Sequence, residues 1–167
     1  MDFFGFLDSA NIFGQILALI GAALAVILSG IGSSRGVGLA GETAAGVNSE
    51  NPEVSSKLLV LQLLPATQGI YGFLIGVIVL INTGVLGGAM KDVTIGQGLQ
   101  YIVACLPIAI VGYYSAIKQA KVAAAGMLMT GQRPEMSGKG VTMAVMVETY
   151  AVFALLVSFL MVSAIKL

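Results

Sequence analysis

Residues 143–157 read MAVMVETYAVFALLV, and Glu148 is the only one of these fifteen that is charged at neutral pH. The surrounding segment is equally apolar, because the twenty-six residues between Lys139 and Lys166 contain no other charge. A bilayer-spanning helix needs about 20 predominantly apolar residues, so this segment is long enough to cross a membrane. A carboxylate inside such a helix is energetically costly and by default marks a functional site. The segment therefore predicts a membrane helix that carries one functional carboxylate.

The composition of the whole chain is that of a membrane protein. Of its 167 residues, 57% are hydrophobic and only 10% are charged, whereas soluble domains average about 25% charged residues. The net charge is zero and no basic tract stands out, which argues against a nucleic-acid partner. The single cysteine, Cys105, lies in apolar sequence and is predicted to pack in the core. The N-terminal sequence MDFFGFLDSANIFGQ is acidic where a secretory signal is positively charged, so we expect the first apolar stretch to be retained.

Four apolar stretches are long enough to span a bilayer, at about residues 11–47, 55–85, 94–130 and 138–167. The breaks NSENPEV, LGGAMKD and GQRPEMS are short and rich in turn residues, so neighbouring helices are predicted to be antiparallel. Six of the eight Lys and Arg residues lie at or near the first and third breaks: Arg35, Lys57, Lys118, Lys121, Arg133 and Lys139. The positive-inside rule then predicts that these two loops are cytoplasmic and that both termini are outside.

The two helical hairpins resemble two copies of one unit. Three pairs of residues recur at a nearly constant offset: Pro52 and Pro134 (82 apart), Ser34 and Ser115 (81 apart), Gln68 and Glu148 (80 apart). We therefore predict an all-α membrane protein of four transmembrane helices, in which residues 1–85 and 86–167 are duplicated hairpins. In this register the first copy holds a neutral glutamine where the second holds its carboxylate.

Small residues form continuous rows along two of the helices. The first row is Gly14, Ala18, Ala22, Ala25, Ser29, Gly32, Gly36, Ala40 and Ala44, and the second is Ala109, Gly112, Ala116, Ala120 and Ala123. In lipid, close backbone approach along such faces drives helices together. We therefore predict that these faces bring many copies of the chain into a closed ring, with the first and third helices on its inner wall. The alternative is ordinary packing inside one four-helix bundle.

The second helix presents polar groups along one face. In LLVLQLLPATQGIYGF, the residues Leu64, Thr67, Gln68 and Tyr71 fall at i, i+3, i+4 and i+7. Pro65 within this stretch cannot donate a backbone hydrogen bond, so the helix is predicted to bend there.

Three polar side chains are predicted to lie at one depth in the membrane. Gln68, Gln119 and Glu148 are each 14 to 16 residues from the proline of a cytoplasmic loop, which is about 20–25 Å at about 1.5 Å per residue. The groups that meet there are one hydroxyl, two amide carbonyls, a backbone carbonyl and one carboxylate. All of them offer oxygen, the ligand atom that hard cations prefer, and the one carboxylate neutralises one monovalent charge. This predicts a sodium site. The alternative is that Thr67 and the two glutamines hydrogen-bond across the helices and hold a protonated Glu148.

Four segments, SGIGSSRGVGLAGETAAG, LLPATQGIYGF, KQAKVAAAG and MVETY, resemble the membrane proteolipid of V-type ATPases. That family consists of duplicated four-helix subunits whose copies form a rotor ring. The likeness covers nearly the whole chain, which within the family is similar to the sodium-translocating branch. It implies Na⁺ ligands at the backbone carbonyl of Leu64 and at the side chains of Thr67, Gln68, Gln119 and Glu148, with Tyr71 supporting the carboxylate through a hydrogen bond.

The resemblance also implies a mechanism and partners. A separate soluble head would hydrolyse ATP and turn the ring through a central stalk, and this chain, which has no GxxxxGK[ST] phosphate loop, would not be an enzyme. A membrane stator subunit with a cationic residue would attract the ion-free carboxylate, and the loaded, nearly neutral site would rotate through the membrane lipid. A proton-carrying version of the same ring, and a small multidrug-type secondary transporter that uses Glu148, are the alternatives. A pore-forming oligomer would leave the threonine and the two glutamines unexplained.

Overall fold

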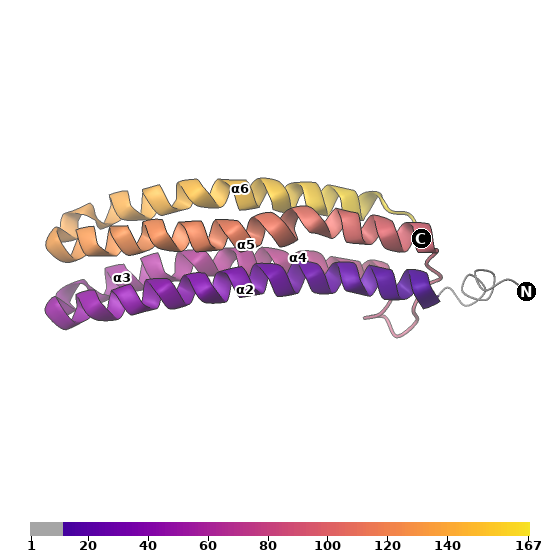
Figure 1. The fold of residues 1–167 in the computed structure, drawn as a ribbon, viewed down its shortest axis with the longest axis horizontal. Helices are drawn as coiled ribbons and strands as arrows, with labels where there is room; N and C mark the ends of the chain where they lie inside the picture. The colour runs from indigo at the N-terminus through magenta and orange to yellow at the C-terminus, as the bar shows by residue number, and fades with distance from the viewer. Residues whose placement is uncertain (1–11) are drawn as a thin grey trace, which may run out of the picture.

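The computed structural model describes residues 12–167, which form a bundle of four long, antiparallel helical segments (Figure 1). The first and third segments are the helices α2 (Ile12–Glu50) and α5 (Ile95–Gln132). The second consists of the 3₁₀ turn η1 (Pro52–Val54), α3 (Ser55–Leu63), the 3₁₀ turn η2 (Leu64–Ala66) and α4 (Thr67–Asn82). The fourth consists of the 3₁₀ turn η3 (Pro134–Met136) and α6 (Ser137–Ala164).

All four segments are long and apolar enough to cross a membrane, which confirms the prediction of four spans. The 39 residues of α2 make a helix of about 58 Å, so it extends beyond a hydrocarbon core of about 30 Å. The second segment ends at Asn82 rather than at residue 85, because Gly84 adopts a left-handed conformation (φ 80°) that terminates the helix. The fourth ends at Ala164 rather than at residue 167. The predicted start at residue 11 lies outside the described residues.

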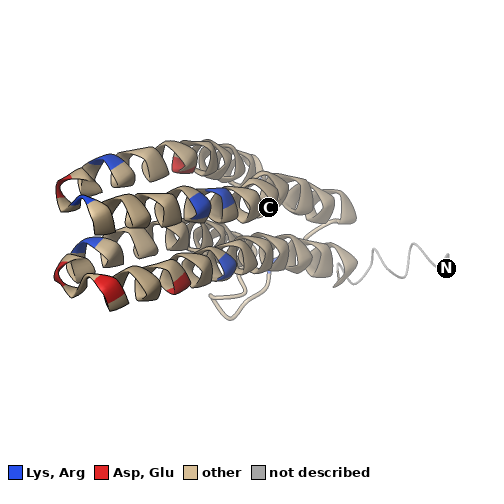
Figure 2. Ribbon diagram, turned by 60° about the vertical axis from the view of Figure 1, so that its left-hand side comes forward, with Lys and Arg blue, Asp and Glu red and all other residues tan. Residues whose placement is uncertain are grey.

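The two short loops lie side by side at one end of the bundle (Figure 1). Asn51 Nδ2 donates a hydrogen bond to Gly131 O (3.1 Å), and Lys57 Nζ donates one to Pro134 O (3.0 Å). Most of the Lys and Arg residues lie in the half of the bundle that carries these loops, as Figure 2 shows. This is the charge distribution from which the positive-inside rule predicts a cytoplasmic loop end.

The rows of small residues pack against each other inside one chain, so the prediction that they join different copies is wrong. All nine members of the α2 row and all five of the α5 row are buried in the single chain. A Cβ added at Gly32 would lie 2.6 Å from the Cα of Tyr113 on α5, and one at Gly36 would lie 2.9 Å from Ala116 O. The small residues therefore let α2 and α5 approach closely within the bundle. Cys105 is buried in the same core, as predicted.

The structural counterpart of Ser115 is Ser33, and the predicted match with Ser34 is wrong by one residue. Ser34 is exposed, whereas Ser33 and Ser115 are buried. Their hydroxyls each donate to a carbonyl oxygen of the segment that follows, Ser33 to Ala66 (3.4 Å) and Ser115 to Val147 (3.2 Å). The offset between these serines is 82 residues, which equals the offset between the starts of η1 and η3.

Large apolar side chains cover the outward faces of α4 and α6. Phe73 on α4 and Phe153 and Leu160 on α6 are 59%, 61% and 65% exposed in the single chain. Side chains of this size on the outside of a bundle mark a surface that lipid or another protein covers. Together with the four apolar segments, they indicate a protein that lies in the membrane.

Candidate ion-binding site

The candidate site lies where η2 interrupts the second segment. Pro65 has no N–H group to donate, and the backbone tightens around it, so that Thr67 N bonds to Leu64 O across only three residues. Thr67 Oγ1 donates to the same carbonyl oxygen (3.0 Å). Where the sequence predicts a bend at Pro65, the structure has this 3₁₀ turn, which leaves the carbonyl oxygen of Leu64 beside the hydroxyl of Thr67.

A chain of hydrogen bonds runs from this turn across to α6. The single hydroxyl proton of Thr67 is shared between Leu64 O and Gln68 Oε1, which lies 3.3 Å from Thr67 Oγ1. Gln68 Nε2 donates to Gln119 Oε1 (2.6 Å) on α5. Gln119 Nε2 in turn donates to Glu148 Oε2 (3.2 Å) on α6. The depth estimate from the sequence is thus correct, since all three polar side chains meet.

The second oxygen of the carboxylate is held from α4. Tyr71 OH donates a hydrogen bond to Glu148 Oε1 (2.5 Å). In the described residues both hydrogen bonds to this carboxylate come from neutral groups, the phenol of Tyr71 and the amide of Gln119. The negative charge of Glu148 is therefore available to a bound cation.

The site is closed on one side and open on the other. Gln68 and Gln119 are completely buried, whereas Glu148 is half-buried. The outer side of Glu148 borders a hollow of about 350 Å³ that is lined by Val145, Val152 and other residues of α6. The carboxylate thus lies at the boundary between a buried polar chain and the apolar surface that faces the membrane.

The oxygens of the site suit a monovalent cation. Five groups can supply oxygen ligands: the carbonyl of Leu64, the hydroxyl of Thr67, the amide oxygens of Gln68 and Gln119, and the carboxylate of Glu148. Residues 12–167 contain no group of three or more His, Cys, Asp and Glu side chains that could hold a metal ion. A buried divalent ion beside a single carboxylate would keep an uncompensated charge, whereas a monovalent ion would be neutralised.

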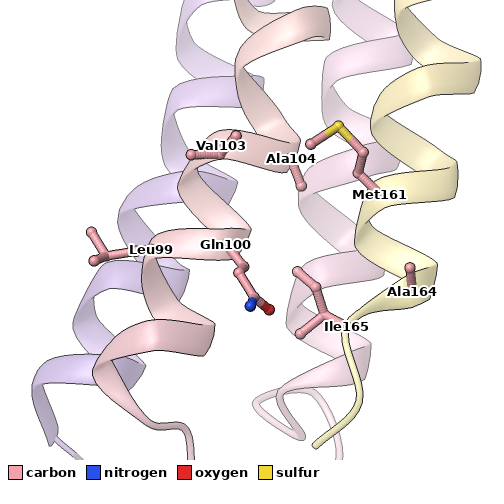
Figure 3. Close-up of a pocket in the computed structure, with 7 residues that line it drawn as sticks. All are labelled: Leu99, Gln100, Val103, Ala104, Met161, Ala164 and Ile165. Atoms are coloured by element: carbon pink, nitrogen blue, oxygen red, sulfur yellow. The ribbon is translucent and has the colours of Figure 1, made fainter.

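A larger hollow in the described part of the chain lies elsewhere and lacks this chemistry. It measures about 430 Å³ and opens between α5 and α6 near the end of the chain (Figure 3). Its walls are apolar, with Leu99, Val103 and Met161 among them, and its one polar side chain is Gln100. With no charged group on its walls, this cleft does not suit an ion.

The family model that describes the C subunit of ATP synthase matches the sequence twice, at residues 20–79 and at residues 102–161, which together make up more than half of the chain. The chain belongs to the ATP synthase C-subunit family. The double match confirms the predicted duplication of the hairpin. Family membership also makes the chain a non-catalytic, multi-pass membrane protein, which agrees with its four apolar helices.

Two proteins with functional names are similar to this chain. The chain is 46% identical over 149 residues to the V-type sodium ATPase subunit K of Enterococcus hirae, an alignment that covers 89% of this chain and 92% of the relative. It is 35% identical over 147 residues to the A-type ATP synthase subunit K of Methanocaldococcus jannaschii, covering 87% of this chain and 61% of that protein.

The two C-subunit repeats also correct the predicted register around the carboxylate. Both matches have the same length and begin 82 residues apart, so Ala66 rather than Gln68 corresponds to Glu148. The predicted pairing of Gln68 with Glu148 at an offset of 80 is therefore wrong. Gln68 and Glu148 instead belong to one site, where Gln119 bridges them.

One member of this polar cluster, Ser115, was not predicted as a site residue. Its hydroxyl accepts a hydrogen bond from Gln68 Nε2 (3.3 Å) and donates one to Val147 O (3.2 Å). The sequence does contain a signal for it, because Ser115 precedes Gln119 by four residues and so shares its helix face.

Proposed function

We propose that this chain binds and carries Na⁺ across the membrane as a rotor subunit of a V-type ATPase. The ligands are the carbonyl oxygen of Leu64 and the side-chain oxygens of Thr67, Gln68, Gln119 and Glu148, with Tyr71 holding the carboxylate. The observation that carries this proposal is the continuous chain of hydrogen bonds from Thr67 to a single half-buried carboxylate. The 46% identity to a V-type sodium ATPase subunit K supports sodium as the ion.

The working cycle follows from the charge of Glu148. Binding of Na⁺ neutralises the carboxylate, so the loaded site can pass through lipid, whereas the bare carboxylate cannot cheaply do so. A cationic residue of a membrane stator subunit attracts the ion-free carboxylate and opens the site to water. Since the site contains one carboxylate, which belongs to the second repeat, each chain of four helices carries one ion.

The proposal includes an assembly and its partners. Many copies form a closed ring whose outside faces lipid and the stator subunit, and a central stalk connects the ring to the soluble head that hydrolyses ATP. The exposed aromatic and aliphatic side chains of α4 and α6 supply surface for neighbouring copies and lipid. The loop end is cytoplasmic, both termini are outside, and residues 1–85 and 86–167 are the two copies of the hairpin.

The family match bears on the alternative functions that the sequence leaves open. Membership of the C-subunit family argues against the multidrug-type transporter and the pore-forming oligomer. The proton-carrying ring differs from the sodium ring only in its cargo. It predicts that the purified ring binds no Na⁺ saturably.

A sodium-binding isotherm on the purified oligomer tests the proposal. We expect about one Na⁺ per chain in the wild type, because Glu148 is the only carboxylate of the site. Glu148→Gln should abolish binding. The control is Glu135→Gln, which removes an exposed carboxylate from η3 and should leave binding unchanged. Wild-type protein without saturable Na⁺ binding, or a Glu148→Gln variant that binds as the wild type does, would overturn the sodium assignment.

A further inference from the structure

Ser115 contacts the candidate site without being one of its proposed ligands. It lies one helical turn before Gln119 on α5 and is only 6% exposed. Its hydroxyl accepts from Gln68 Nε2 (3.3 Å) and donates to Val147 O (3.2 Å), the carbonyl oxygen of the residue before Glu148. Both hydrogen-bonding roles of this hydroxyl are therefore used inside the site.

The amide of Gln68 has to be oriented for an ion to bind. A side-chain amide presents an oxygen on one side and an NH₂ group on the other, and only the oxygen can be a cation ligand. In the completely buried side chain of Gln68, the two N–H groups are taken by Gln119 Oε1 (2.6 Å) and Ser115 Oγ (3.3 Å). Oε1 is thereby turned toward the hydroxyl of Thr67 (3.3 Å), which also contacts the carbonyl oxygen of Leu64 (3.0 Å).

We propose that Ser115 is a positioning residue, which fixes the orientation of the Gln68 amide so that its oxygen faces the ion. The inference rests on the proposed function, because it concerns the same sodium site. Without the hydroxyl, one buried N–H of Gln68 has no acceptor, and the rotated amide, which presents its NH₂ group to the ion, is penalised less. The affinity for Na⁺ therefore falls although no ligand atom is removed.

The first repeat supplies a matched control. Ser33, the counterpart of Ser115, is 7% exposed and also joins two segments, accepting from Gly69 N (2.7 Å) and donating to Ala66 O (3.4 Å). Both of its partners are backbone groups. Ser33→Ala therefore removes a buried hydroxyl of similar surroundings without freeing the Gln68 amide.

The experiment measures the Na⁺ dissociation constant and the thermal stability of the assembled ring for Ser115→Ala, Ser115→Thr and Ser33→Ala. Ser115→Ala should weaken Na⁺ binding by about 3- to 10-fold, as expected for loss of one neutral hydrogen bond. Ser115→Thr keeps the hydroxyl and should bind within about twofold of the wild type. Ser33→Ala should lower stability but leave the dissociation constant unchanged. If Ser115→Ala also affects only stability, Ser115 is structural and the inference is wrong.

A double-mutant cycle with Gln68→Ala shows whether Ser115 acts through that amide. In the Gln68→Ala background, Ser115→Ala should cause no further loss of affinity, because there is no amide left to orient. An equal loss in both backgrounds would overturn the inference while leaving the sodium site intact. A wild-type ring that binds no Na⁺ would instead overturn the proposed function and this inference together, so the two failures are distinguishable.

Discussion

Replacing Tyr71 by Phe should weaken sodium binding strongly while leaving the fold intact. The substitution removes only the hydroxyl that donates to Glu148 Oε1 at 2.5 Å and keeps the ring that packs against the core. A hydrogen bond to a charged group contributes about 1.5–3 kcal/mol. At about 1.4 kcal/mol for each tenfold change, the dissociation constant for Na⁺ should rise about 10- to 150-fold.

The assay is protection of Glu148 from a hydrophobic carbodiimide, measured over a series of Na⁺ concentrations at fixed pH. The control is Tyr101→Phe, because the hydroxyl of Tyr101 is buried and has no hydrogen-bond partner in the described residues. That variant should be protected at the same Na⁺ concentration as the wild type. Equal protection of Tyr71→Phe and the wild type would refute the reasoning, since it would mean that the phenol does not hold the carboxylate in its ion-binding position.

Three further predictions concern the packing, the carboxylate and the ligands. Gly32→Leu should destabilise the single chain and not merely its assembly, because an added Cβ lies 2.6 Å from the backbone of α5 and overpacking costs about 1–3 kcal/mol or more. The control is Gly30→Leu, which should fold normally because nothing lies within 4 Å of a Cβ added there. Thermal unfolding in detergent measures both variants. The carbodiimide should label Glu148 alone, and Na⁺ should slow the labelling. This protection should strengthen at higher pH, because protons compete for the same oxygens. K⁺ should protect poorly, and a labelling rate that does not depend on Na⁺ at any pH would indicate proton transport. Thr67→Ala and Gln119→Ala should each weaken Na⁺ binding without dissolving the ring, and unchanged affinity in either variant would make that residue structural.

The sequence predicted the four helices well because a membrane leaves few choices. A spanning segment must satisfy its own backbone hydrogen bonds, so long apolar stretches become helices, and short breaks make them antiparallel. The site is predictable for a related reason: counting residues from the loops gives the depth of each side chain, and this places Gln68, Gln119 and Glu148 at one level. Tyr71 was placed on the correct face by helical spacing alone, and the family resemblance implied its bond to the carboxylate.

Other features could not be obtained from the sequence in the same way. A row of small residues indicates close approach of helices but does not identify the partner helix. The sequence therefore predicts a contact between copies for the face containing Gly32, which instead packs on α5. The repeat register was ambiguous by one or two residues, because few identities join the halves. Burial resolved it in favour of Ser33, whose neighbour Ser34 is exposed.

The half-exposure of Glu148 determines the route that an ion can take. Behind the carboxylate, the amides of Gln68 and Gln119 are completely buried and hydrogen-bonded to each other, so the inner end of the proposed site is closed. An ion bound there enters and leaves through the same opening, on the outward side of α6. With the proposed function, the chain is therefore an ion carrier with a single opening and not a channel. Net transport then requires the whole site to move between the aqueous compartments on the two sides of the membrane. A ring that cannot rotate should therefore not let sodium cross the membrane.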